Sequence, residues 1–354
     1  MKLTKKSPIP AAAAAAGSDA AAPLLAVTDL VVEFHTPRGV VRAVNGLSYT
    51  VEAGRTLAIV GESGSGKSVS SQAVMGLLQT PPARIAGGSI VFEGTNLLSL
   101  SRKQHRAFCG ENIAMVFQDA LAALNPVYTV GWQLTEALRV RRGLSKGDAR
   151  RRAVELLDLV RVPAAAQRVK EYPHQFSGGM RQRVMIAMAL ALDPQLLIAD
   201  EPTTALDVTV QAQIMRLLAD IQQERQMGLI LITHDLGVVA DVADDVTVMY
   251  AGRSVEAADV MDTYARPAHP YTEALLRSIP RLDSKGKELP VIPGRPPELL
   301  ALPPGCAFAP RCDYAQDVCR TDPPPPDVEP APGRTAACHF AAEVMDHVAP
   351  RTRA

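Results

Sequence analysis

The chain has 354 residues, which is long enough for one large domain with a smaller appendage. Its 37 basic and 37 acidic side chains balance, so it lacks the basic excess that nucleic-acid binders usually carry. No uninterrupted apolar run approaches the roughly 20 residues that a membrane-spanning helix needs, so any link to a membrane must come through a partner.

The first 23 residues combine three lysines with an alanine-rich stretch that prolines interrupt. We expect a low-complexity tail here rather than a signal peptide, because the alanines are only weakly hydrophobic. Strand-like segments then alternate with helix-like ones, which predicts an α/β core over residues 24–260. The expected strands cover residues 27–34, 48–51, 57–60, 195–199 and 229–233, and a helix is expected over 68–78.

A glycine-rich segment follows the strand at 57–60 and fits the pattern G-x-x-x-x-G-K-[ST]. Its glycines allow backbone N–H groups to surround phosphate oxygens, and the next helix directs its positive end at them. Lys67 is expected to reach the β- and γ-phosphates, and the Ser68 hydroxyl to bind Mg²⁺. The predicted nucleotide-contacting residues of this phosphate loop are Gly61, Ser63, Gly64, Ser65, Gly66, Lys67 and Ser68.

Two acids end the apolar strand that is predicted near residue 198. Asp200 is placed to bind Mg²⁺, directly or through water. Glu201 is one residue further along, where it can polarise an attacking water. For this pair alone, a solvated strand end is an equally good interpretation.

The segment that begins Phe176-Ser177-Gly178-Gly179-Met180 lies before these acids, with Ser177 23 residues ahead of Asp200. It resembles the signature motif of ABC ATPases, although Met180 replaces the usual Gln. Other family motifs match too: Gln118 follows an apolar strand, Asp207 closes a D-loop, His234 follows the strand at 229–233, and Phe34 is placed to stack on adenine.

This resemblance implies a P-loop nucleotide-binding domain with a RecA-like core, an antiparallel β subdomain and a helical subdomain. Two ATPase subunits would sandwich ATP, so that Ser177, Gly178, Gly179 and Asp207 serve the nucleotide on the partner. Ser177 is expected to cap a helix that begins near Met180. Gln118 would sense the γ-phosphate and contact Mg²⁺, and His234 would orient the water.

The resemblance also implies partners and a location. We expect two transmembrane permease subunits, whose coupling helices dock on residues 119–190. A second ATPase, related or identical to this chain, and a periplasmic or extracellular substrate-binding protein complete the set. The chain itself would lie peripherally on the cytoplasmic face of the inner membrane.

The chain changes character near residue 260, since 17 of its 28 prolines lie from Pro267 onward. Proline disfavours long regular elements, so a loop-rich appendage is expected. We place this extension at 261–340 and a second tail at 341–354. It contains four cysteines with the spacing C-x5-C-x6-C-x18-C, namely Cys306, Cys312, Cys319 and Cys338.

The extension resembles the C-terminal region of oligopeptide and dipeptide importer ATPases, which implies a 4Fe–4S cluster on these cysteines. Four thiolates can also close a tetrahedral zinc site, although the C-x2-C pairs common in such sites are absent, and four unligated cysteines are a third interpretation. Cys109 stands alone and is expected to be an ordinary buried thiol. Di- or oligopeptides are the expected cargo.

Three alternatives compete with this interpretation, and the sequence argues against the last two. Nickel and glutathione importers share this architecture, so the cargo is not fixed by the motifs. A soluble ABC ATPase acting on DNA or ribosomes would carry a coiled-coil insertion or a second cassette, and neither is present. A non-hydrolysing module would have lost Lys67, Glu201 or His234, and the sequence retains all three.

Overall fold

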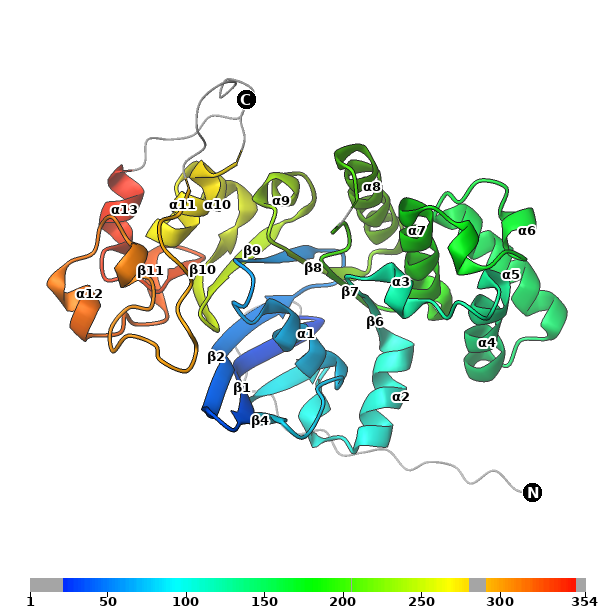
Figure 1. Cartoon of the computed structure of the whole chain (residues 1–354), viewed down its shortest axis with the longest axis horizontal. Coiled ribbons are helices and arrows are strands. Elements are labelled where there is room, and N and C mark those ends of the chain that lie inside the picture. Colours follow the sequence, from blue (N-terminus) through cyan, green and yellow to red (C-terminus); the bar gives the residue numbers. More distant parts are fainter. Residues whose placement is uncertain (1–21, 205, 280–290, 348–354) are drawn as a thin grey trace.

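The computed structural model describes residues 22–204, 206–279 and 291–347. Figure 1 shows two sheets at the centre, a group of helices on one side and the C-terminal extension on the other. This mixed α/β architecture confirms the fold class that the sequence predicts. Within the described part of the chain, no helix is both long and apolar enough to cross a membrane.

The larger sheet has eight strands in the order β11-β12-β10-β9-β3-β8-β7-β6. The five strands β9, β3, β8, β7 and β6 run parallel, and their residues are almost entirely buried. Apolar strands of this kind are typical of a parallel sheet that is covered on both faces. The bounds are β3 Thr56–Val60, β6 Ile113–Val116, β7 Leu196–Asp200, β8 Gly228–Thr233, β9 Asp245–Tyr250 and β10 Arg253–Asp259.

The smaller sheet is antiparallel and has the strand order β2-β1-β4-β5. Its bounds are β1 Leu25–Thr36, β2 Gly39–Val51, β4 Ala83–Phe92 and β5 Thr95–Asn96. Buried side chains of this sheet, including Leu30 and Ile90, share a core with Ile59 of β3 and Ile230 of β8. The smaller sheet therefore packs on the parallel sheet, and helix α1 Lys67–Met75 contacts both sheets.

The helices on the side of β6 pack around Leu134, Leu156 and Ile186, in a core that continues to Leu197 of β7 and Leu229 of β8. Figure 1 shows these helices, α3 to α7, at the right of the molecule. The bounds of the helices between α1 and α10 are α2 Arg102–Asn112, α3 Ala120–Ala123, α4 Val130–Arg142, α5 Lys146–Leu159, α6 Ala165–Arg168, α7 Gly178–Ala189, α8 Val208–Arg225 and α9 Leu236–Val242.

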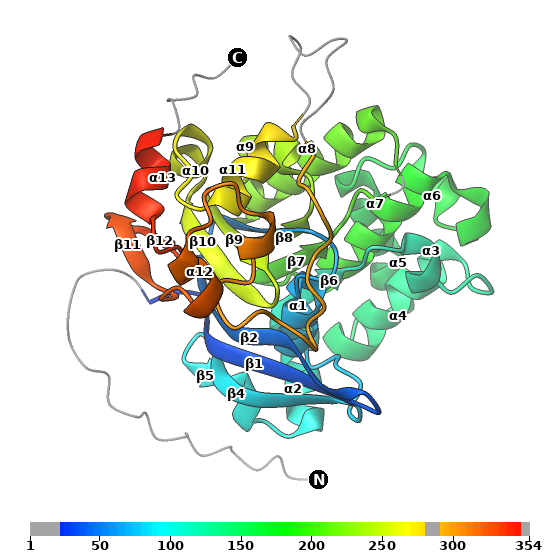
Figure 2. The same ribbon diagram turned by 60° about the vertical axis from the view of Figure 1, so that its left-hand side comes forward.

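The C-terminal extension contains short elements separated by proline-rich loops. They are α10 Val260–Ala265, α11 Pro270–Arg277, α12 Asp317–Thr321, β11 Val328–Ala331 and β12 Arg334–Ala336. Helix α13 Ala341–His347 follows in the stretch that the sequence analysis places in a tail, and its Ala341 and Met345 pack against the extension. Strand β12 pairs with β10, where Glu256 lies opposite Ala336. The extension thus continues the core sheet, as Figure 2 shows with β10, β12 and β11 side by side. The sequence did not predict this pairing.

The predicted strands are confirmed with shifts of one or two residues at their ends, except that the strand expected over 48–51 already begins at Gly39. The predicted helix at 68–78 runs from Lys67 to Met75 and ends at Gly76. The helix of the signature motif starts at Gly178, two residues before the expected Met180. The reason is that Ser177 is the N-cap and accepts a hydrogen bond from the Met180 N–H, so the first turn lies between them. The predicted tail over 1–23 lies mostly outside the described residues.

Candidate active site at the edge of the parallel sheet

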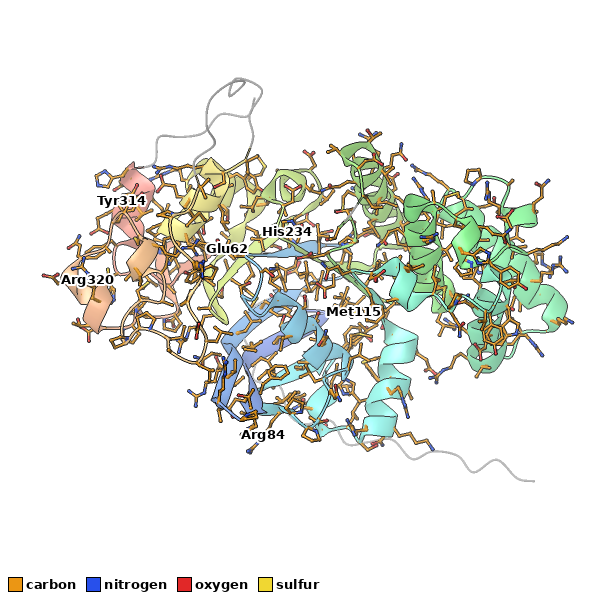
Figure 3. The ribbon with its side chains drawn as sticks, viewed as in Figure 1. Glu62, Arg84, Met115, His234, Tyr314 and Arg320 are labelled. Atoms are coloured by element: carbon orange, nitrogen blue, oxygen red, sulfur yellow. The ribbon has the colours of Figure 1, made fainter. Side chains whose placement is uncertain are left out.

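The strand order brings four loops to one edge of the sheet. Strands β6, β7, β8 and β3 are neighbours and parallel, so their carboxyl ends lie together. Gln118 follows β6, Glu201 follows β7, His234 follows β8, and the phosphate loop follows β3. Figure 3 marks His234 and Glu62 on two of these loops. The sheet therefore gathers residues that are up to 173 positions apart, from 61 to 234.

The phosphate loop passes so close to neighbouring backbone that two of its positions require glycine. A Cβ at Gly61 would lie 2.2 Å from the Met249 carbonyl oxygen, and one at Gly66 would lie 2.3 Å from that of Ala43. Both residues also have positive φ, 153° and 101°. These glycines hold the loop against β9 and β2, and helix α1 begins directly after Gly66.

Lys67 lies inside this loop and is buried. Its Nζ donates hydrogen bonds to the carbonyl oxygens of Gly61, at 2.7 Å, and Glu62, at 3.0 Å. Burial lowers the pKa of Lys67, while the charges of Glu201 and Asp200 act in the opposite direction. The ammonium group thus lies where the loop backbone curls, which is the position from which it can contact phosphate oxygens.

Ser68 and Asp200 contact each other across the two loops. The Ser68 hydroxyl donates a hydrogen bond of 2.9 Å to Asp200 Oδ1. Burial raises the pKa of Asp200, and the bond from Ser68 partly opposes this. A hydroxyl and a carboxylate are hard oxygen ligands of the kind that Mg²⁺ prefers when phosphates complete its shell. The pair fits two of the predicted Mg²⁺ ligands, and the third, Gln118, donates its hydrogen bond to Glu201.

The Glu201 carboxylate is held by three side chains. It accepts hydrogen bonds from Gln118 Nε2 at 2.8 Å and Thr204 Oγ1 at 2.9 Å. The Nδ1 atom of His234 lies 3.3 Å from its other oxygen. Glu201 has a φ of 46°, a left-handed conformation that is rare for residues other than glycine. The structure therefore brings the three predicted catalytic residues together around one carboxylate.

Thr204 is a contact that the sequence analysis did not predict. It lies three residues after Glu201, and its backbone N–H also donates to the Glu201 carbonyl at 3.2 Å. The sequence does indicate such a contact in one way, because a hydroxyl residue in the turn after the acids can donate a hydrogen bond back to Glu201. Ala205, the next residue of the D-loop, lies outside the described residues.

The signature residues lie apart from the phosphate loop of the same chain. Helix α7 packs against α3, α4 and α5, whereas α1 contacts β1, β2 and β7. Ser177 caps α7, and Asp207 caps α8 by accepting from the Val210 N–H at 2.9 Å. Gly179 faces the same Val210, whose side chain would lie 2.6 Å from an added Cβ. Ser177, Gly178, Gly179 and Asp207 thus form a second, separate group.

Phe34 lies on β1 of the antiparallel sheet, opposite Val41 of β2 and Ala83 of β4. It is partly buried against the core that the two sheets share. The same β2 strand passes the phosphate loop at Ala43, two residues along from Val41. Phe34 therefore belongs to the antiparallel sheet that borders the phosphate loop. It does not lie on any of the four loops at the edge of the parallel sheet.

The four cysteines of the extension line one pocket, together with His269 and Phe308. All five cysteines of the chain are free thiols. Burial raises the pKa of Cys312 to about 11 and that of Cys338 to about 12. Among residues 22–204, 206–279 and 291–347, no three or more His, Cys, Asp or Glu side chains are arranged to hold a single metal ion. Cys109 is buried elsewhere, in α2.

Two family models match the chain. The model described as ABC transporter matches residues 44–204, which include the phosphate loop, the signature motif and both acids. The model described as oligopeptide/dipeptide transporter, C-terminal region, matches residues 255–319. Three of the four clustered cysteines lie within this second match.

Curated relatives and solved structures agree with these matches. The chain is 53% identical to the oligopeptide transport ATP-binding protein OppD of Salmonella typhimurium, over 91% of this chain and 95% of that protein. It is 53% identical to the dipeptide transport ATP-binding protein DppD of Bacillus subtilis, over 84% and 88%.

Among solved structures, the dimeric post-hydrolysis state of the ATP-binding cassette MJ0796, bound to ADP and Pi, matches with a TM-score of 0.60 and 25% identity. That match covers 67% of this chain and 98% of the cassette. Fold, site geometry and relatives thus point the same way. The chain belongs to the ABC transporter family, as an ABC-type ATPase related to the OppD and DppD ATP-binding subunits.

Proposed function

We propose that this chain hydrolyses ATP to power the import of di- or oligopeptides through partner permeases. The observation that carries the proposal is the meeting of the phosphate loop, Asp200 and Glu201 at one edge of the parallel sheet. The relatives that cover most of the chain are named as oligopeptide and dipeptide transport ATP-binding proteins. This supports peptides as the cargo.

In the proposed ATP site, backbone N–H groups of the phosphate loop bind the phosphates, and Lys67 neutralises their charge. The loop residues are Gly61, Ser63, Gly64, Ser65, Gly66, Lys67 and Ser68. Ser68 and Asp200 would hold Mg²⁺, with Gln118 nearby, and the ion supplies positive charge to the phosphate oxygens when it is bound. Phe34 would stack on the adenine base.

For hydrolysis, we assign Glu201 as the group that accepts a proton from the attacking water. Its contacts with Gln118 and His234 support this role, because both side chains fix the direction of the carboxylate. The His234 side chain is 62% exposed, so it is open to a ligand, and we assign it a contact with the γ-phosphate. Gln118 links this site to α3 and the helical region that follows it.

A second ATPase subunit is needed to complete the site in this proposal. Ser177, Gly178, Gly179 and Asp207 would contact the nucleotide that the partner binds, since they lie apart from the phosphate loop of their own chain. The dimeric MJ0796 cassette supports this arrangement. The partner is a related ATPase or a second copy of this chain.

The remaining partners follow from the same family. Two permease subunits would dock on residues 119–190, and a periplasmic or extracellular protein would deliver the peptide. The chain would lie on the cytoplasmic face of the inner membrane as a peripheral subunit. Exposed apolar side chains at Val127, Tyr128 and Trp132 of the helical region support a docking surface there.

We also propose that the cysteines of the extension hold a 4Fe–4S cluster, with zinc as the alternative. Four thiols line one pocket, which is the ligand set that either group needs. No three of the described His, Cys, Asp or Glu side chains are arranged around a single ion, so the preference for the cluster over zinc rests on the family resemblance alone. The cluster would supply a covalent link between α12 and the segments around it, so its role here is structural.

Elemental analysis tests this second proposal. The full chain, purified without oxygen, should contain iron and acid-labile sulfide, and Cys312→Ser should lose most of both. Cys109→Ser is the matched control, because Cys109 is buried outside the pocket and should leave the metal content unchanged. Full metal retention in Cys312→Ser, or a wild-type chain without bound metal, would refute the four-cysteine site.

Uptake by cells tests the cargo. Cells that lack this chain should regain uptake of labelled di- and oligopeptides when the wild-type chain is restored. Unlabelled peptides should compete for this uptake, whereas nickel and glutathione should not. Restored uptake of nickel or glutathione, with no change in peptide uptake, would move the cargo to that solute while leaving the ATPase assignment in place.

A further inference from the structure

Glu62, the second residue of the phosphate loop, has no part in the chemistry described so far. Its carboxylate accepts two hydrogen bonds from Arg311, from Nη1 to Oε2 at 2.6 Å and from Nη2 to Oε1 at 2.9 Å. Arg311 comes from the C-terminal extension, 249 positions away in the sequence. The side chain of one domain therefore holds the loop of the other by a two-point ion pair.

The surroundings of Arg311 fix its direction. The side chain is only 5% exposed. Its Nε donates to the Pro293 carbonyl at 2.8 Å, and Nη1 lies 3.2 Å from the Tyr250 hydroxyl. The guanidinium also lies over the rings of Tyr250 and Phe308. A planar guanidinium held from several sides has little freedom, so it presents a fixed fork to Glu62.

The backbone of Glu62 is held as well. Its N–H donates a hydrogen bond of 2.8 Å to the hydroxyl of Tyr271, which lies on α11 and is fully buried. Its carbonyl oxygen accepts the bond of 3.0 Å from Lys67 Nζ. Every polar group of Glu62 is thus engaged, and two of the three are engaged by the extension. The position of the Lys67 ammonium depends on the same residue.

We infer that Arg311 is a positioning residue for the phosphate loop, through which the C-terminal extension sets the affinity for ATP. A phosphate loop binds by the directions of its backbone N–H groups, so the residue that orients its first turn affects every phosphate contact. This inference rests on the proposed role of the loop in ATP binding. It gives the extension a part in the nucleotide site itself.

The test compares ATP hydrolysis and ATP binding by the assembled transporter with wild-type chain, Arg311→Gln and Arg311→Lys. Charged hydrogen bonds contribute enough that Arg311→Gln should raise the KM and Kd for ATP about tenfold. Turnover at saturating ATP should change much less, because the loop holds ATP before and during reaction. Arg311→Lys keeps the charge but loses the two-point hydrogen bonding of the guanidinium, so its KM should lie between those of the wild type and Arg311→Gln.

A double-mutant cycle with Glu62→Gln separates positioning from folding. If Arg311 and Glu62 act as one unit, the double variant should have a Kd for ATP no higher than that of the single variant with the higher Kd. Arg320→Gln is the matched control: Arg320 belongs to the same extension and pairs with Asp317, but at the surface. Figure 3 shows Arg320 at the outer side of the extension, away from Glu62. It should leave the KM unchanged.

The outcomes differ clearly. A folded Arg311→Gln with wild-type KM and Kd, or additive effects in the cycle, would overturn the inference and leave the proposed ATPase function standing. If Arg311→Gln does not fold, Glu62→Gln and Arg311→Lys decide, and wild-type KM in both would overturn it. A wild-type transporter that does not bind ATP would instead refute the proposed function.

Discussion

At the scale of single residues, the Glu201 carboxylate is the point where three loops meet. Gln118 reaches it from the loop after β6, Thr204 from its own turn, and His234 from the loop after β8. Its direction therefore depends on the placement of all three. Gln118 also begins the segment that leads into the helical region, so a shift of that region can reach the proposed catalytic group directly.

His269 is a second residue whose environment leads to a prediction. It caps α11, and its Nδ1 accepts a hydrogen bond of 3.0 Å from the Tyr271 N–H. Burial lowers the pKa of His269 from 6.5 to about 3. Between these two values the unfolded chain binds a proton that the folded chain does not, so stability must fall as the pH falls from 6.5 towards 3.

We expect His269 to reduce the free energy of unfolding by about 2 kcal/mol between pH 7.5 and pH 5. Chemical denaturation of the full chain at a series of pH values measures this. His269→Asn keeps a neutral acceptor at the N-cap but does not titrate, so its stability should vary less over the same range. Equal pH dependence in the two proteins would show that His269 is not the group responsible.

At the scale of elements, local signals in the sequence predicted most of the core. The strand at 57–60, the glycines of the phosphate loop and the two acids at the end of β7 each have a local sequence pattern, and the structure has them where expected. The glycines are required because the loop touches the Met249 and Ala43 carbonyls. These glycines can be predicted without knowing the fold, because the sequence motif itself specifies which positions must be glycine.

Long-range contacts could not be predicted in this way. The pairing of β12 with β10 joins Glu256 to Ala336, and no local pattern in a proline-rich segment indicates a partner strand. The ion pair of Arg311 with Glu62 could not be predicted either, because each residue taken alone is expected to be an ordinary surface charge. Residues of the family motifs could be proposed from local patterns in the sequence, whereas Arg311 depends on the contact between domain and extension and could not.

At the scale of the whole molecule, the chain contains two separate groups of nucleotide motifs. The phosphate loop lies at the edge of the parallel sheet, and the signature helix α7 begins in the helical region. In the proposed dimer, each group would meet the complementary group of the partner. The extension is connected to the same machinery, since it continues the core sheet and holds Glu62.

The central claim is that ATP hydrolysis at Glu201 drives peptide import. Glu201→Gln keeps the shape of the side chain and removes the proton acceptor, so ATP binding should persist. Because proton transfer by a positioned group contributes about 100-fold or more, turnover should fall by at least that factor. Peptide uptake should stop with it. Glu111→Gln, the same exchange at an exposed position of α2, is the control and should leave both activities unchanged.

The most direct measurement is therefore the rate of ATP hydrolysis by the assembled transporter with the wild-type or the Glu201→Gln chain, with labelled-peptide uptake followed in parallel. We predict rapid hydrolysis and uptake with the wild type, and bound ATP without turnover or uptake with Glu201→Gln. Hydrolysis at the wild-type rate in Glu201→Gln would contradict the assignment of this carboxylate. Continued peptide uptake without hydrolysis would contradict the coupling.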